Sequence, residues 1–165
     1  LRRREVHAGG TGPGQGPRDL ARRGVTAEAV TTPVELRVRY SETDQMGVAY
    51  HAHYLAWCEL ARTEHMRRLG VRYRDLEERG LKLTVAEVHV RYARPARYDD
   101  LLRVTAWLSD VGSRKVVFQY RVERVDDAAL LATAETALVS LDQSNRPTRI
   151  PAEALAIMES AVQRA

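Results

Sequence analysis

The sequence predicts an α+β protein in which an antiparallel sheet of five strands wraps around one long buried helix. The hydrophobic pattern favours this class because it runs in the order strand, long helix, four strands and short helix. Length favours it too, since 165 residues with 44% hydrophobic content can fill one sizeable core but hardly two. We therefore expect one domain over residues 33–165, preceded by a leader over residues 1–32.

The first strand and the long helix are predicted from a change of period. In the segment VELRVRY, residues 34–40, every second residue is apolar, which is typical of a half-buried strand. This apolar face consists of Val34, Leu36, Val38 and Tyr40. From residue 51 to residue 69 the apolar side chains follow helical spacing instead, and Gly70 provides a stop signal. They occupy more than one face, so this helix should be largely enclosed, with His65 partly exposed.

The remaining elements follow from shorter patterns. A helical turn is expected at residues 73–78, and the next strand changes the parity of its apolar face, which predicts a β-bulge near Ala86 and Glu87. Pro95 then argues for an edge or a break. Three further strands and a C-terminal amphipathic helix are predicted around residues 102–108, 116–122, 131–141 and 152–162.

The net charge of +4 lies mostly in the leader. Residues 1–32 contain six arginines and three acidic residues, whereas the rest of the chain has 20 basic and 19 acidic side chains. A nearly neutral domain disfavours binding to a nucleic-acid backbone. The leader is rich in Gly, Pro and Arg, and we expect it to be disordered or extended because it has few large apolar side chains to bury.

Several classes of protein and chemistry are disfavoured by what the sequence lacks. No apolar run reaches the roughly 20 residues that a membrane span needs, and the N-terminal pattern is not that of a signal peptide. The single cysteine, Cys58, lies in the predicted helix on an apolar side, which favours a buried hydrophobe over a nucleophile. Neither a G-x-S-x-G elbow nor a nucleotide-binding glycine motif occurs. We expect a cytoplasmic protein.

The candidate site is the stretch YSETDQMGVAYHAHY, residues 40–54, where the first strand gives way to the helix. Asp44 in this place is compatible with catalysis, but also with capping a helix or closing a turn. His51 and His53 are two residues apart and therefore point away from each other on a helix, and no further ligand has the spacing of a closed zinc site. We expect no metal at this site.

The motif and its surroundings resemble a known family. The string VRYSETDQMGVAYHAHYLAWCELARTEHMRRLG is similar to the signature of the hotdog-fold acyl-CoA thioesterases of the 4-hydroxybenzoyl-CoA thioesterase family, in the tol-pal-associated branch. RYARPARYDDLLRV resembles the family's second and third strands, and DQSNRPTRIP its exit to the last helix. The resemblance covers residues 34–160 and implies hydrolysis of an acyl-CoA thioester without a bound cofactor.

The resemblance gives the residues of the motif specific roles. Asp44 takes the place of the family's catalytic aspartate, which acts as nucleophile or as general base, and the backbone amide of His51 that of the donor to the carbonyl oxygen. Such a donor stabilises the negative charge that develops during thioester hydrolysis. Gly47 allows a tight turn and a close approach of the substrate. Tyr50 and Glu59 are assigned to substrate binding, with Glu59 facing the acyl pocket.

Coenzyme A carries phosphates, which require cations or backbone donors. By resemblance, Ser113, Arg114 and Lys115 are the first candidates for this role, and Arg97 is the next. Ordinary solvated charges at a strand edge would look the same in the sequence. The family also implies a homo-oligomer, a dimer or tetramer with the active site at the subunit interface. A non-catalytic hotdog domain that binds acyl-CoA as a sensor or scaffold is the alternative, and a dehydratase of this fold lacks its usual motif here.

Overall fold

The computed structural model describes residues 30–162 and confirms the predicted order of elements. The leader falls outside the described residues except for its last three positions, and the first strand already includes Thr32. The elements are β1 (Thr32–Arg37), the 3-10 turn η1 (Tyr40–Glu42), α1 (His53–Arg68), α2 (Tyr73–Glu78), β2 (Lys82–Tyr92), β3 (Leu101–Val111), β4 (Lys115–Arg124), β5 (Leu130–Leu141) and α3 (Ala152–Ser160). No helix within residues 30–162 is long and apolar enough to cross a membrane.

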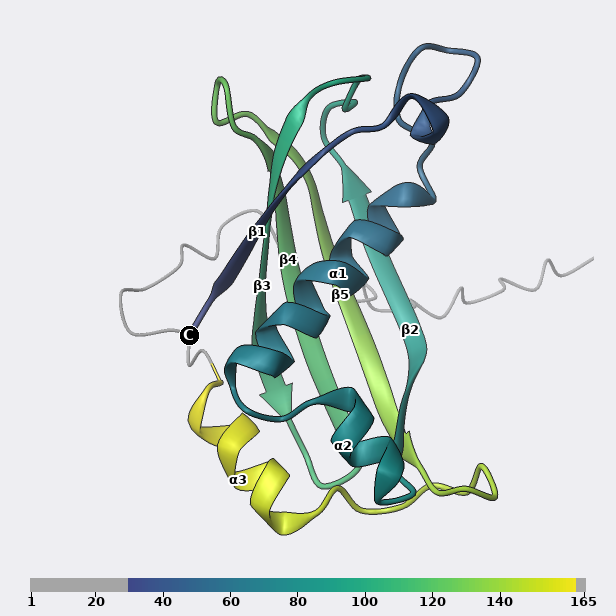
Figure 1. The fold of residues 1–165 in the computed structure, drawn as a ribbon, viewed down its shortest axis with the longest axis vertical. Helices are drawn as coiled ribbons and strands as arrows, with labels where there is room; N and C mark the ends of the chain where they lie inside the picture. The colour runs from purple at the N-terminus through teal and green to yellow at the C-terminus, as the bar shows by residue number, and fades with distance from the viewer. Residues whose placement is uncertain (1–29, 163–165) are drawn as a thin grey trace, which may run out of the picture.

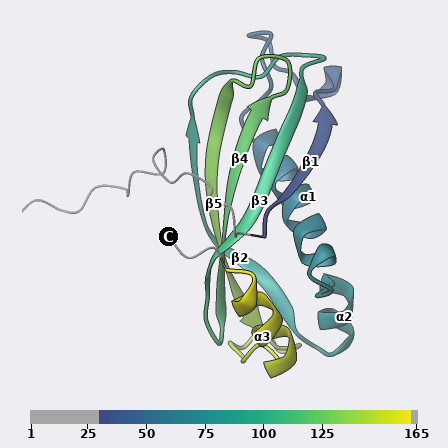
Figure 2. The same ribbon diagram turned by 90° about the vertical axis from the view of Figure 1, so that its left-hand side faces the viewer.

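The five strands form one antiparallel sheet in the order β1-β3-β4-β5-β2. Figure 1 shows α1 lying diagonally across one face of this sheet, and Figure 2 shows the strands curving around it. The short helix α3 lies at the end of the sheet where β3 finishes. The predicted α+β class, with a sheet that wraps around one long helix, is therefore confirmed.

The core lies between α1 and the concave face of the sheet. Along β3, the apolar side chains at every second position are completely buried, as the period of two predicts. The helix contributes a stripe of buried side chains to the same core, and its apolar residues on the opposite side, Leu55 and Leu60, are 39% and 44% exposed. The buried helix residues are Tyr54, Trp57, Cys58, Ala61, Arg62, His65 and Met66. Within residues 30–162, α1 is thus covered on one side only, and the expectation that this helix is largely enclosed was wrong for a single chain.

Strand β2 has the predicted β-bulge, with a register shift between Val85 and Glu87. Within residues 30–162 it pairs only with β5, so its other edge is open. Val85, Val88 and Tyr92 along this strand are 42%, 39% and 45% exposed. A long open edge with apolar side chains is a surface suited to pairing with another strand.

Two further local expectations were wrong. Tyr40 does not belong to the apolar face of β1, because the strand ends at Arg37 and Tyr40 begins the 3-10 turn, where it is 78% exposed. His65 is not partly exposed but completely buried. Its Nδ1 lies 3.0 Å from the Thr32 hydroxyl, and its ring meets Phe118 edge-on. The strand that covers His65 is distant in sequence, so helical spacing alone could not reveal its burial.

Burial of His65 predicts a pH-dependent stability. Burial, assisted by the charge of Arg68, lowers the pKa of His65 from 6.5 to about 4. Between these values the unfolded chain binds the proton and the folded chain does not, so stability is complete above pH 6.5 and is lost as the pH falls toward 4. The loss is on the order of 3 kcal/mol. Urea titrations at several pH values give the free energy of unfolding as a function of pH. His65→Gln should lack the fall between pH 6.5 and 4, and the same pH dependence in both proteins would contradict the assignment.

Candidate active site

The site is built on a buried carboxylate that the sequence did not single out. Glu42 is only 3% exposed and accepts hydrogen bonds from the backbone N–H and guanidinium of Arg39, at 2.8 and 2.9 Å, and from the indole N–H of Trp57, at 3.1 Å. Burial raises its pKa, but these hydrogen bonds outweigh burial, and the pKa is lowered overall. Glu42 therefore joins the end of β1 to the core face of α1 while remaining ionised.

A tight loop then carries Asp44. The amide of Asp44 donates to the Val48 carbonyl at 2.9 Å, and the amide of Gly47 donates to the Asp44 carbonyl, also at 2.9 Å. Thr43 and Ala49 form a bridge at the base of the loop. Gly47 has a φ of +72°, a left-handed conformation that strains residues with a Cβ. The turn role proposed for Gly47 is therefore present, and it aims the loop back toward α1.

Asp44 closes a turn as well as facing a cavity. Its Oδ1 accepts a hydrogen bond of 2.8 Å from the Met46 amide, which is the local contact expected of a turn aspartate. It does not cap α1, which begins nine residues later at His53. Within residues 30–162, Oδ2 has no hydrogen-bond partner, and the half-buried side chain lines the cavity described below. One oxygen is thus positioned by the loop while the other remains available.

The residues just before α1 supply one free backbone donor. Within the first turn of the helix, the amide of His53 donates to the Tyr50 carbonyl and that of Leu55 to the Ala52 carbonyl, at 3.0 and 3.1 Å, so these amides are already bonded. Within residues 30–162 the amide of His51 has no acceptor. Unpaired amides before a helix, together with the helix dipole, favour negative charge. The His51 amide is therefore free to donate to a ligand.

Asp44 and His51 line the same cavity of about 270 Å³, beside the end of β2. The segment that follows β2 forms its other wall and is tied to α1 by two tyrosines. The Tyr92 hydroxyl donates to the His51 carbonyl at 2.9 Å, and the Tyr54 hydroxyl accepts from the Ala96 amide at 2.9 Å. The lining residues are Asp44, Met46, Val48, Ala49, His51, Tyr54, Tyr92, Ala93, Arg94 and Pro95.

Three of the other predicted residues lie near this cavity or further along α1 without lining it. Tyr50 is 45% exposed, with its ring 4.3 Å from that of His51. Arg97 is exposed in the loop after β2, where its amide donates to Asp100. Glu59 is exposed on α1, and its charge contributes to raising the pKa of Tyr73 in α2. Their roles in substrate binding remain predictions.

The predicted phosphate-binding residues lie at the opposite end of the sheet from Asp44. Ser113, Arg114 and Lys115 are in the β3–β4 hairpin, which Figure 1 shows at the end where β2 begins. Lys115 Nζ lies 3.8 Å from Glu87, whereas Tyr92 lines the Asp44 cavity. Five residues of strand separate these two β2 positions, or about 16 Å. One chain alone does not bring the hairpin and Asp44 together.

Four residues that shape the site were not among those predicted: Glu42, Tyr54, Tyr92 and Arg94. Among the described residues, Arg94 is the only cation that lines the cavity, and it comes from a segment that is remote from the motif in sequence. Tyr54 had a signal, since it lies at the start of the helix on its apolar side, where a hydroxyl needs a partner. Within residues 30–162 no group of three His, Cys, Asp or Glu side chains is placed to hold a metal ion.

The fold is that of the hotdog thioesterases, and comparison with known proteins agrees. The chain belongs to the thioesterase-like superfamily, whose family model matches residues 38–158. It is 37% identical to the acyl-CoA thioesterase YbgC of Haemophilus influenzae over 119 residues, which is 72% of this chain and 87% of that protein. It is 40% identical to YneP of Bacillus subtilis over 88 residues, which is 53% of this chain and 64% of that protein.

A solved structure shares the fold. The chain superimposes on the DHNA-CoA thioesterase of Staphylococcus aureus with a TM-score of 0.69 and 30% sequence identity, covering 72% of this chain and 80% of that one. The predicted family and hotdog fold are therefore confirmed. The tol-pal-associated branch stays a prediction.

The Glu42 contacts yield a stability prediction. The Glu42 carboxylate accepts hydrogen bonds from Arg39 and Trp57. Glu42→Gln replaces one accepting oxygen with an NH₂ group that faces these donors. The free energy of unfolding should therefore fall by about 1–3 kcal/mol. Urea denaturation followed by tryptophan fluorescence measures this loss. Glu78→Gln, an exposed substitution on α2, is the matched control. Equal stability of both variants would show that Glu42 does not hold the loop.

Proposed function

We propose that the protein hydrolyses an acyl-CoA thioester to the free acid and coenzyme A, with Asp44 as the reacting carboxylate. The observation that carries this proposal is the convergence of the Asp44 side chain and the His51 backbone on one cavity at the start of α1. Membership of the superfamily makes the protein a thioester hydrolase. An acyl-CoA substrate is supported by YbgC and the DHNA-CoA thioesterase, whose names specify CoA thioesters.

The proposed chemistry uses the two groups in one of two ways. As a nucleophile, Asp44 attacks the thioester carbonyl, expels the CoA thiolate and forms a mixed anhydride, which water hydrolyses. As a general base, Asp44 takes a proton from a water molecule that attacks the same carbon directly. In both routes the carbonyl oxygen gains negative charge, and the His51 amide donates to it. The Met46 amide, bonded to Oδ1, orients the carboxylate in either case.

We infer further that two copies of the chain form the complete site by pairing through β2. In a symmetric antiparallel pair, the beginning of one edge strand lies beside the end of the other. The hairpin with Ser113, Arg114 and Lys115 then approaches Asp44 of the second copy and can meet the CoA phosphates. The open apolar edge of β2 supports this arrangement. A dimer, or a tetramer of two such dimers, is therefore the expected state.

Replacement of the carboxylate tests the assignment of Asp44. Asp44→Asn keeps the side-chain oxygen that accepts from Met46, so the loop should remain folded while kcat falls by a factor on the order of 100 or more. Release of free thiol from short, long and aromatic acyl-CoAs measures the rate, and circular dichroism checks the fold. An unchanged rate with normal CoA binding would instead favour a sensor or scaffold that binds acyl-CoA without cleaving it.

The shared site predicts complementation between two defective variants. Arg114→Gln/Lys115→Gln should raise KM for acyl-CoA but have little effect on KM for an acyl-pantetheine, which lacks the nucleotide phosphates. If this protein is unfolded and refolded together with Asp44→Asn, half the dimers are mixed, and each mixed dimer contains one intact site. At an acyl-CoA concentration well below the raised KM, where both variants are nearly inactive, the mixture should then recover about one quarter of the activity of the wild-type protein. Activity no greater than the average of the two separate variants would contradict a site made by two chains.

A further inference from the structure

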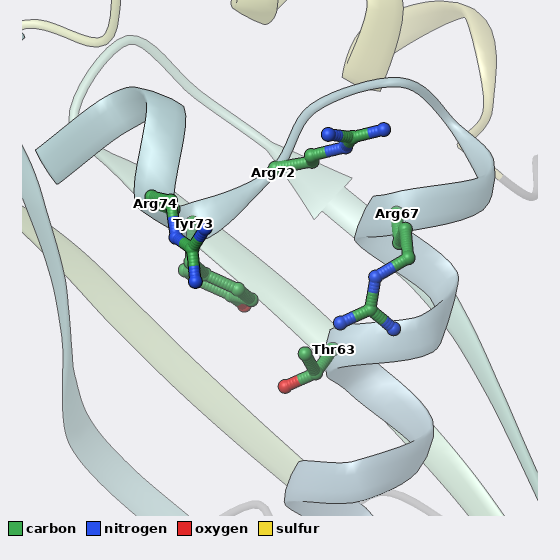
Figure 3. Close-up of a pocket in the computed structure, with 5 residues that line it drawn as sticks. All are labelled: Thr63, Arg67, Arg72, Tyr73 and Arg74. Carbon is green, nitrogen blue, oxygen red and sulfur yellow. The ribbon is translucent and has the colours of Figure 1, made fainter. Parts of the chain in front are cut away.

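A second cavity, of about 450 Å³, lies between α1 and α2, away from Asp44. Its walls carry three arginines, a threonine and a tyrosine: Thr63, Arg67, Arg72, Tyr73 and Arg74. Figure 3 shows Thr63 and Arg67 projecting from α1 toward the space between the helices, with Tyr73 and Arg74 on the α2 side. Neither the sequence motif nor the proposed hydrolysis uses any of these five side chains.

The charges around this cavity are mostly uncompensated. Arg67 forms an ion pair with Glu64 on its own helix. Within residues 30–162, neither Arg72 nor Arg74 has an ion-pair partner, although guanidinium groups readily bind carboxylates where these are near. Arginines in the last turn of a helix also stabilise its dipole, which accounts for Arg67 but not for the two that lie beyond α1. Among the described residues, the lining of the cavity therefore carries three cationic side chains and no anionic one.

A buried hydroxyl beside the cavity is stronger evidence for a ligand than the charges are. The Tyr73 hydroxyl is completely shielded and has no hydrogen-bond partner within the described part of the chain, and in Figure 3 it points from α2 toward α1. Burial raises the pKa of Tyr73 to about 12, the nearby Arg62 guanidinium opposes this shift and the charge of Glu59 adds to it, so the phenol stays protonated. An unsatisfied buried hydroxyl costs about 1–3 kcal/mol, which makes it a feature that requires an explanation.

Arg62 adds a charge beneath the cavity. It is 8% exposed, its Nε has no hydrogen-bond partner among residues 30–162, and its Cζ lies 5.7 Å from the centroid of the Tyr73 ring. The acids nearest to it on α1 are Glu59, which is exposed, and Glu64, which is paired with Arg67. A buried cation without a paired anion is costly, and an anion bound above Tyr73 would offset that cost.

We propose that this cavity binds the phosphate group of an organic phosphate, at a site distinct from the Asp44 cavity. Arginines bind phosphate oxygens through paired N–H groups, the Thr63 hydroxyl provides a further donor, and the shielded Tyr73 hydroxyl lies beneath them with its hydrogen-bonding capacity unused. A phosphate monoester carries a charge between about −1.5 and −2, which matches the arginines that lack acidic partners. The volume exceeds that of a phosphate ion and accommodates an attached organic group. The CoA nucleotide and a separate phosphorylated molecule are the two possible sources.

Titration calorimetry with inorganic pyrophosphate tests the site without any hydrolysis. At fixed ionic strength the wild-type protein should bind pyrophosphate, and Arg72→Gln/Arg74→Gln should bind it at least about tenfold more weakly, since each lost charged hydrogen bond accounts for roughly that factor. Arg149→Gln, which removes an exposed arginine outside the cavity, is the matched control and should bind normally. Absence of binding by the wild-type protein, or equal affinity in all three proteins, would overturn the proposal.

Tyr73→Phe separates a ligand contact from a purely structural role. Removal of an unpartnered hydroxyl should leave Tm equal or higher, because a desolvation cost disappears, while pyrophosphate binding weakens severalfold. Unchanged pyrophosphate binding would show that Tyr73 does not contribute to the site. The cavity would then be no more than a group of surface arginines, and the proposal would fail.

The same variants identify the source of the phosphate. If Arg72→Gln/Arg74→Gln raises KM for acyl-CoA but not for acyl-pantetheine, the nucleotide end of CoA occupies the cavity. If pyrophosphate binding falls while both KM values stay normal, the site binds a different phosphorylated molecule. Asp44→Asn should leave pyrophosphate binding intact, so failure of the proposed hydrolysis and failure of this site give different results.

Discussion

The packing of α1 into the curved sheet is the contact on which the rest of the molecule depends. The helix has large apolar side chains that are stable only when removed from water, and the concave face of β3 and β4 provides the complementary surface. Trp57 connects this core to the site, because its ring is buried against the sheet while its indole N–H reaches Glu42. Wherever the packing places the first turn of α1, the loop with Asp44 must follow.

The division between scaffold and site follows from this geometry. Glu42 and the tyrosines Tyr54 and Tyr92 satisfy backbone or side-chain groups at the junction of the loop, the helix and β2. Asp44 Oδ2 and the His51 amide are the groups left without partners within the described residues. For the proposed hydrolysis this arrangement is preorganised, because the supports are bonded while the proposed reacting groups are not, and little rearrangement is needed when a substrate binds.

The two ends of the molecule have different electrostatic character. At the Asp44 end a carboxylate faces the cavity, and Arg94 is the one cation among the described residues that line it. At the other end lie the arginines around Tyr73 and the β3–β4 hairpin with Arg114 and Lys115. A symmetric pair of chains joined along β2 would bring these ends together, as the proposed assembly requires.

The sequence by itself determined the order and type of the elements, the bulge in β2, and the place of Asp44, Gly47 and His51 in one turn before the helix. These features depend on contacts between residues that are close in sequence, and such contacts produce a periodic hydrophobic pattern or a fixed motif spacing in the sequence. Tertiary structure alone decided that His65 is buried under β1, that Tyr40 turns outward, and that Arg94 and Tyr92 complete the cavity. It also decided that the hairpin cations lie far from Asp44 in one chain. Each of these facts depends on which distant segments become neighbours when the sheet wraps around the helix, and local sequence patterns do not specify such long-range contacts.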